Sequence, residues 1–405
     1  MLRLLITLLA LALPLSALAD TYDLLYRARL QPDSGTARVE IQLSGDKLPR
    51  KLTLDLSSGR YADLHSDQKL EHNGEKVTWF PKGPEASLSY QFTIDEKKGS
   101  GHYDSRITKD WAILRSDKLI PPMSVVANRH IHSRAELVLD LPKGWSSALP
   151  YREISDQRYK LVDPGRRFIR PKGWMIAGRI GSRQDEIDGI NVTVAAPLGE
   201  NIHRQDTLAF LSYNLPDLKK VFPNFPRRLL VVSAGDPMWR GGLSGTRSLF
   251  MHADRPMISG NRTSSIIHEL VHVATGIHGD KHSDWIVEGL AEYYALEITR
   301  RSGGIGEKRY KEAMDDLAKW GREAPTLLRK RSSGPITARA VGVMREVDRE
   351  IRQSSGGKAS LDDVARALAE DRGEVSLAKF RHLAEQAAGG PVPALQLERL
   401  SKPEK

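Results

Sequence analysis

The sequence predicts an α+β protein in which an antiparallel β-sandwich is followed by a mostly helical domain with a small sheet. Up to about Pro197 apolar and polar residues alternate with a period of two. From Ser264 onward the apolar residues recur with a helical period instead. The length of 405 residues is too great for one ordinary core. We therefore expect two domains after a leader, covering residues 20–197 and 198–405.

The first nineteen residues have the pattern of a cleaved signal peptide. Arg3 gives a positive start, Leu4–Leu18 is an apolar run, and Ala17-Leu18-Ala19 fits the small-x-small rule for cleavage after Ala19. The run is short for a membrane span and contains Pro14. We therefore expect residues 1–19 to be removed. The mature protein would then be periplasmic or secreted, with no stable membrane span.

The composition limits both the chemistry and the partners. Cysteine is absent, so any metal must be held by His, Asp and Glu. The formal net charge is +10, but acidic residues are interleaved with the basic ones. The densest basic run, Arg329-Lys330-Arg331, has Ser and Gly on its C-terminal side and predicts a solvated loop. No nucleic-acid partner is expected, and the charge suits anionic surroundings in a cell envelope.

The N-terminal region predicts strands separated by turns. Segments such as RARVEIQL, KLTLDL, ASLSYQFTI and INVTVAA alternate in polarity or are rich in β-branched residues. Turn signals such as Asn73-Gly74 and Pro142-Lys143-Gly144 lie between them. His130 and His132 would share one face of a strand, which we interpret as a polar face and not as a metal pair. No catalytic constellation is evident in this region.

The C-terminal region predicts two strands and six helices. The strands are Leu229–Ser233 and Ser248–His252. Apolar periodicity and capping residues place the helices at Ser265–Ala274, Trp285–Arg301, Glu307–Trp320, Ala338–Gln353, Leu361–Ala369 and Leu377–Ala388.

The segment HELVH, residues 268–272, predicts a metal site. His268 and His272 are four residues apart and therefore project from one face of a helix, where two imidazoles can share a small cation. Glu269 lies about 100° around the same helix, where it can contact a metal-bound water without binding the metal. The residues offer two candidates for a third ligand. His278 lies six residues after His272, as in HExxHxxGxxH, but Thr275 stands where that pattern needs Gly.

Glu288 is the rival third ligand. It lies one turn into the next predicted helix, and Glu292 shares its face. With Glu288 on the metal, Glu292 would hydrogen-bond a ligating histidine. In that arrangement His278 and His282 would lie in the connection between the two helices, most simply in contact with solvent.

HELVH followed by WIVEGLAEYY, residues 285–294, resembles the gluzincin zinc peptidases, and within them the glycyl aminopeptidase family. The family's GGLEHxxS strand is echoed by residues 241–248, and a later helical stretch by residues 350–368. The resemblance covers most of the mature chain. It implies a thermolysin-like catalytic domain that holds one Zn²⁺ through His268, His272 and Glu288.

The sequence also departs from that family. Ser244 and Gly245 stand where the family has Glu and His, and the family's downstream Tyr aligns with the segment Thr337-Ala338-Arg339-Ala340. The chain reaches Lys405 soon after its last predicted helix, so we expect no C-terminal PDZ domain. Ser244 and Arg247 are candidates for a substrate groove. Tyr310 and His382 are the remaining candidates for an oxyanion donor.

These patterns predict an exported zinc metallopeptidase that hydrolyses envelope peptides or proteins. Zinc-bound water would be the nucleophile and Glu269 the general base. The alternative is a catalytically weak or inactive relative, stabilised by zinc, that acts as an envelope binding or assembly protein. Retention of Glu269 favours the enzyme, because a structural zinc site needs no base. The small residues at 244 and 245 predict endopeptidase-like activity. A metzincin that uses His278 is the third interpretation.

Overall fold

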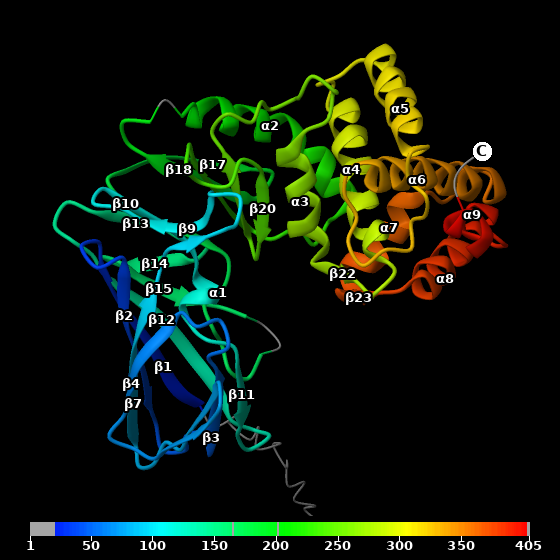
Figure 1. Ribbon diagram of the computed structural model, residues 1–405. Helices are drawn as coiled ribbons and strands as arrows, with labels where there is room; N and C mark the ends of the chain where they lie inside the picture. Colours follow the sequence, from blue (N-terminus) through cyan, green and yellow to red (C-terminus); the bar gives the residue numbers. More distant parts are fainter. Residues whose placement is uncertain (1–20, 164–165, 201, 403–405) are drawn as a thin grey trace, which may run out of the picture.

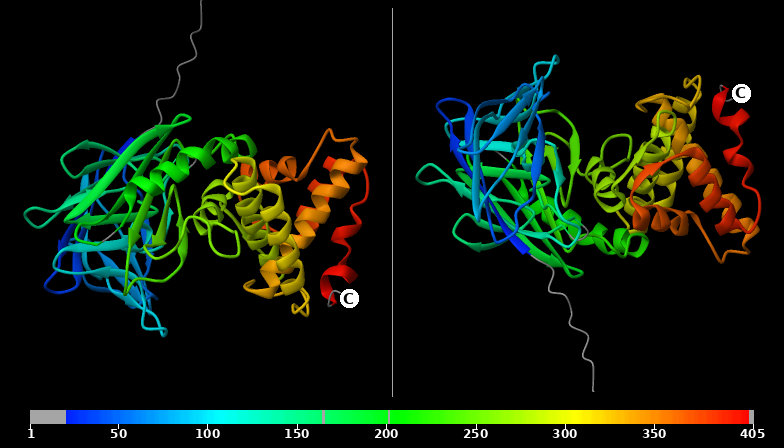
Figure 2. Two further views of the ribbon diagram at one scale, coloured as in Figure 1. Left: turned by 90° about the horizontal axis from the view of Figure 1, so that it is seen from above. Right: turned by 90° about the horizontal axis from the view of Figure 1, so that it is seen from below.

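The computed structural model describes residues 21–163, 166–200 and 202–402. The predicted signal peptide lies outside these residues. A β-rich N-terminal part and a helical C-terminal part lie at opposite ends of the molecule, with a further sheet between them (Figures 1 and 2). None of the helices in the described residues combines the length and hydropathy of a membrane span.

The N-terminal part is a sandwich built on a seven-stranded sheet. Inward side chains alternate with outward ones along its long strands, as the period-two pattern predicted. All its pairs are antiparallel except that β1 runs parallel to β12. The sheet order is β14 (Arg152–Ser155), β15 (Arg158–Leu161), β12 (His132–Asp140), β1 (Thr21–Gln31), β2 (Thr36–Ser44), β7 (Glu85–Thr93) and β4 (Tyr61–His65).

Two smaller sheets cover the inner face of the large one and share its apolar core. A short helix, α1 (Ser116–Leu119), follows β10. The four-stranded sheet has the order β11 (Met123–Val126), β3 (Lys51–Asp55), β6 (Lys76–Trp79) and β5 (Leu70–Asn73). The five-stranded sheet has the order β13 (Ser146–Ala148), β16 (Trp174–Gly178), β10 (Trp111–Arg115), β9 (Tyr103–Ile107) and β8 (Glu96–Lys97).

A second five-stranded sheet crosses the boundary that we expected at residue 197. Its order is β17 (Ile180–Ile187), β18 (Ile190–Pro197), β19 (Arg228–Ala234), β21 (Ser248–His252) and β20 (Gly242–Gly245). The period-two pattern identified β18 as a strand but could not show which sheet it joins. Its parallel pairing with β19 places it with the C-terminal part. The unpredicted helix α2 (Arg204–Val221) connects these two parallel strands.

The second five-stranded sheet lies between two apolar cores. On one face, side chains of β19 and β21 pack with Trp111 and Trp174 of the N-terminal part. On the other face, the sheet shares the large core of the helical part. Trp174 also donates its indole N–H to the Leu243 carbonyl at 2.8 Å and its backbone N–H to the Ser248 hydroxyl at 2.7 Å. These contacts hold the edge strand β20 and its hairpin against the N-terminal part.

The helical part confirms the predicted helices, with ends that shift by three residues or fewer at each boundary. Ser264 and Ser376 cap helix N-termini, and Ser360 forms a capping box with Asp363. The helices are α3 (Ser265–Thr275), α4 (Asp284–Arg301), α5 (Glu307–Gly321), α6 (Pro335–Ser354), α7 (Leu361–Asp371), α8 (Leu377–Ala388), the 3₁₀ turn Pro393–Leu395 and α9 (Leu397–Ser401). The strands β22 (Ile277–Gly279) and β23 (Gly373–Val375) pair in parallel.

Candidate metal centre

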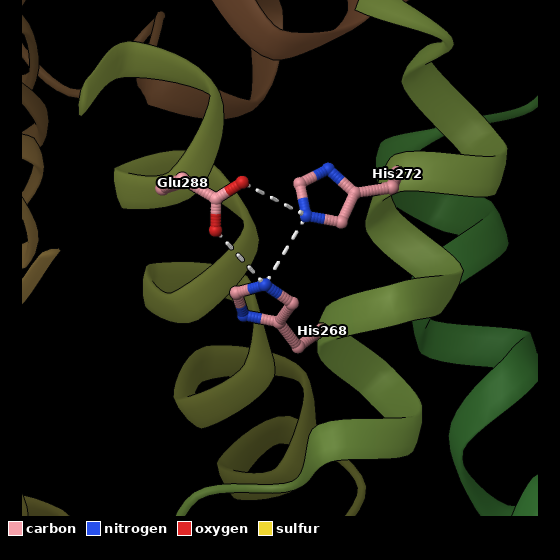
Figure 3. A group of neighbouring side chains, drawn as sticks. All are labelled: His268, His272 and Glu288. Atoms are coloured by element: carbon pink, nitrogen blue, oxygen red, sulfur yellow. Dashed lines mark hydrogen bonds and ion pairs between the residues drawn. The ribbon is translucent and has the colours of Figure 1, made fainter. Parts of the chain in front are cut away.

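Helices α3 and α4 bring two imidazoles and one carboxylate together. His268 and His272 project from one face of α3, and Glu288 reaches them from the first turns of α4 (Figure 3). Gly276 ends α3 in a left-handed conformation, with φ of 59°. The chain can therefore turn back through β22 and start α4 alongside α3. Among the described residues, these three form the group that could hold a metal ion, and all their ligand atoms lie within 4.8 Å of one another.

The spacing of the three side chains fits a zinc ion. Zn–N and Zn–O bonds are about 2.0–2.2 Å, so ligands of a tetrahedral site lie roughly 3.3 Å apart. The Nε2 atoms of His268 and His272 are 3.1 Å apart. The Glu288 oxygens lie 3.4 Å from His268 Nε2 and 3.6 Å from His272 Nε2. Three protein ligands leave a fourth position open, as in catalytic zinc sites.

Glu292 fixes the orientation of the first imidazole. It lies one turn after Glu288 on α4, and its Oε2 is 2.9 Å from Nδ1 of His268. A proton on Nδ1 leaves Nε2 free to bind a metal. This is the contact that the four-residue spacing of Glu288 and Glu292 predicted.

The electrostatics of the cluster show how strongly it favours a positive charge. Burial opposes the charged form of His268, but hydrogen bonds to Glu288 and Glu292 raise its pKa well above the ordinary value. Burial and the neighbouring His268 lower the pKa of His272 to about 4. Burial opposes the ionised form of Glu288, yet its contact with His268 and the charges of both histidines lower its pKa. A cation can replace the proton between these groups.

Glu269 lies beside the cluster and against the edge strand β20. Burial raises the pKa of its carboxyl, whereas the charge of His268 and hydrogen bonds to the hydroxyl and N–H of Ser244 lower it, and the net shift is upward. A Cβ at Gly242 would lie 2.6 Å from Glu269 Cγ. Gly242 is therefore required for the close approach of the strand to Glu269. The pair Gly241-Gly242 is the signal in the sequence for this contact.

His278 lies outside the cluster. It is exposed on the short strand β22, where it is paired in register with Glu374 of β23. Gly276 ends α3 before His278, so the turn between α3 and α4 separates His278 from His272. The described residues thus place Glu288 with the paired histidines, and His278 away from them.

The expected groove residues occupy different environments. Ser244 lies on β20 and faces Glu269. Arg247 does not share that strand, because it lies in the β20–β21 turn with φ of 55°. Its guanidinium is 4.6 Å from the ring of Tyr151 and donates to the carbonyl of Val162 at 3.0 Å. It therefore contacts the N-terminal part and does not point along β20.

The two candidate oxyanion donors lie away from the cluster. Tyr310 of α5 hydrogen-bonds Glu297, which raises its pKa together with burial and the charge of Glu297. Glu297 is nine residues after Glu288, so it points from the opposite face of α4. His382 is exposed on α8. In the segment Thr337-Ala338-Arg339-Ala340, Arg339 of α6 is buried and donates to the carbonyls of Ala324, Arg399 and Lys402.

Solved structures with the same fold include two named proteins. An aminopeptidase N family protein from Idiomarina loihiensis matches with a TM-score of 0.66 and 12% identity, over 94% of this chain and 76% of that one. Native leukotriene A4 hydrolase from Saccharomyces cerevisiae matches with a TM-score of 0.59 and 15% identity, over 96% of this chain and 68% of that one. No family model and no curated protein matches the sequence. At these identities the likeness establishes the fold.

Proposed function

We propose that this protein is a zinc-dependent metallopeptidase that acts on peptides or proteins of the cell envelope. The observation that carries the proposal is the convergence of His268, His272 and Glu288 at distances that suit tetrahedral zinc, with Glu269 beside them. The fold shared with an aminopeptidase N family protein supports it. Export rests on the leader pattern of the first nineteen residues.

The donor set suits zinc, since two imidazoles and a carboxylate with an open position are typical of catalytic zinc sites. When bound there, zinc supplies a Lewis acid that polarises a carbonyl and activates water. Glu292 holds His268 in the tautomer that presents Nε2 to the metal position. Buried leucine and valine side chains of α3 face the core, and the helix also packs against β20 and α4.

Glu269 would carry the proton in hydrolysis. Its carboxylate takes a proton from the attacking water and delivers it to the leaving amine. The raised pKa of the carboxyl suits this exchange, because a base works best when its pKa approaches the working pH. Ser244 steadies the carboxylate through its hydroxyl and its N–H. The packing of α3 against α4 brings the two histidines and Glu269 of α3 near Glu288 of α4.

Replacement of the base tests this function. Glu269→Gln should retain one zinc per chain but lose hydrolysis by at least roughly a hundredfold, because Gln keeps the shape and cannot accept the proton. The measurements are metal content and cleavage of a broad set of peptides. A protein that holds zinc but cleaves none of them in its wild-type form would favour the alternative, a zinc-stabilised binding or assembly protein. Unchanged turnover in Glu269→Gln would exclude Glu269 as the base.

A further inference from the structure

The loop between α5 and α6 carries three adjacent exposed cations. Arg329, Lys330 and Arg331 are all exposed to solvent. Across the part of the chain that the structure describes, no carboxylate lies within ion-pair distance of any of them, whereas Arg300, Arg301 and Arg352 of nearby helices each pair with a carboxylate. The sequence predicted a solvated loop here, and solvent exposure is confirmed. Solvent exposure alone gives no reason for three cations to be adjacent at this place in the fold.

The loop is attached at the rim of the metal centre. The N–H of Ser332 donates to a carboxylate oxygen of Asp284, in the first turn of α4. Asp284 is four residues before Glu288, so the two carboxylates share a face about 6 Å apart along the helix. Burial raises the pKa of Asp284, Glu288 adds to the rise, and Arg331 opposes it. The basic residues therefore lie close to the face of α4 that binds the metal.

Helix packing keeps the loop in this place. A Cβ at Gly289 would lie 2.8 Å from the Cβ of Ala340, so α6 crosses α4 directly beside Glu288. The loop immediately precedes α6, so the packing of α6 against α4 also keeps the loop near α4. Lys281 lies three residues before Asp284 and is also exposed. Cations thus flank the first turn of α4, and the nearby carboxylate of Asp284 is already engaged by Ser332.

We propose that this basic loop, Arg329-Lys330-Arg331, recruits acidic peptide segments to the metal centre, so that the substrates are peptides rich in Asp or Glu. The inference rests on the proposed peptidase function and names its substrate class. Exposed cations on flexible side chains attract carboxylates over about 8–10 Å at moderate ionic strength. They raise the rate of encounter and favour acidic partners over neutral ones.

The surroundings favour a peptide over other anions. A phosphate site would use buried, preorganised donors, and the three side chains here are exposed. A nucleic acid carries a continuous line of charge that the carboxylates of Glu269, Glu288 and Glu292 would repel. An acidic peptide can instead place its carboxylates on the loop and its neutral backbone at the metal centre.

Binding to the full mature chain, loaded with zinc and carrying Glu269→Gln, tests the proposal without turnover. The probes are a labelled Ala/Gly peptide with several Glu residues and its twin with Gln at those positions. The acidic peptide should bind roughly tenfold more tightly, and the difference should shrink with added salt. The triple variant Arg329→Gln, Lys330→Gln, Arg331→Gln should remove the difference.

A matched control separates local from general charge effects. Lys308, Arg309 and Lys311 of α5 are exposed and form no ion pair among the described residues. Their replacement by Gln changes the net charge equally and should leave the preference intact. Equal binding of the two peptides, or equal effects of both triple variants, would overturn the proposal. A third result would also overturn it: the two peptides bind equally, and the loop variant loses binding to anionic phospholipid vesicles. That result would assign the loop to a membrane surface.

Cleavage assays distinguish this proposal from the proposed function. If wild-type protein cleaves neutral and acidic peptides equally well, the peptidase stands and the loop proposal fails. If it cleaves neither, while the zinc-loaded variant still prefers the acidic peptide through the loop, recruitment stands and the peptidase proposal fails.

Discussion

The third ligand that a metal would have depends on the placement of two single residues, Glu288 and His278. Glu288 lies 3.4–3.6 Å from the two histidine Nε2 atoms, whereas His278 is exposed on β22. Helix geometry explains the difference. An 18-residue helix presents Glu288 from a fixed backbone, and the turn after Gly276 carries His278 away. The open position left by three ligands is what a hydrolytic site needs.

Replacing His268 or Glu288 by Ala should therefore lower zinc affinity by more than about tenfold, since a protein ligand is lost. His278→Ala should bind zinc as the wild type does. Metal analysis of the purified variants measures both outcomes. Loss of zinc in His278→Ala together with its retention in Glu288→Ala would show that His278 is the ligand.

Glu292 lies 2.9 Å from Nδ1 of His268 and would act on a bound metal through that imidazole. Glu292→Ala should weaken zinc binding by about 10- to 100-fold, because the imidazole loses the partner that fixes its tautomer and ring orientation. Glu292→Gln should lose less, since it still accepts a hydrogen bond. Competition with a chelator gives the affinities. Wild-type affinity in Glu292→Ala would leave this carboxylate with no role at the site.

The edge strand β20 lies beside Glu269 and would contact a peptide at the proposed site. Gly242 allows the strand to approach Glu269, and Ser244 faces that carboxylate with a hydroxyl. A buried ammonium needs an anionic partner. β20 supplies none, because its four residues are Gly, Leu, Ser and Gly.

We expect a peptide with a free N-terminus and its acetylated twin to be cleaved at rates within roughly fivefold of each other, because β20 has no carboxylate to bind the charged amine. Comparison of kcat/KM for the two peptides is the measurement. Ser244→Glu provides the control and should shift preference toward the free amine. A strong preference for the free amine in the wild type would mean that another acidic residue binds it.

A partly buried ion network on the far side of α4 joins this helix to α7. Glu297 is 6% exposed and pairs with Arg300 at 2.7 Å and Arg301 at 2.9 Å. Arg301 also pairs with Asp362 at 2.7 Å, which ties α4 to α7. Burial opposes ionisation of Glu297, but the two arginines prevail and lower its pKa.

Glu297→Gln should lower the free energy of unfolding by about 2–4 kcal/mol at neutral pH, because both arginines lose a buried partner. The pKa of Glu297 is lower in the folded protein than in the unfolded protein, where it is about 4.3. Ionised Glu297 therefore stabilises the fold fully above the unfolded pKa, and this contribution is lost as the pH falls through the folded pKa. The difference in the free energy of unfolding between wild type and variant should therefore narrow in that acidic range. Urea unfolding at several pH values measures it. Glu307→Gln, an exposed partner of Arg300, should change stability little.

Local sequence patterns were sufficient for the helices α3 to α8 and for the pairing of two histidines on one helix face. The helical period identified α3 to α8, and the spacing within HELVH put His268 and His272 on one face, since both depend only on residues a few positions apart. α2 escaped prediction, in keeping with the internal Pro216 that weakens its helical signal.

Only the tertiary structure decided what depends on distant segments. It placed Glu288 and not His278 beside the paired histidines, joined β18 to β19 across the expected boundary, and set Arg247 against Tyr151. It also brought the loop at residues 329–331 beside α4. Sequence spacing determines which side chains share a face of one element, whereas the packing of elements decides which faces meet.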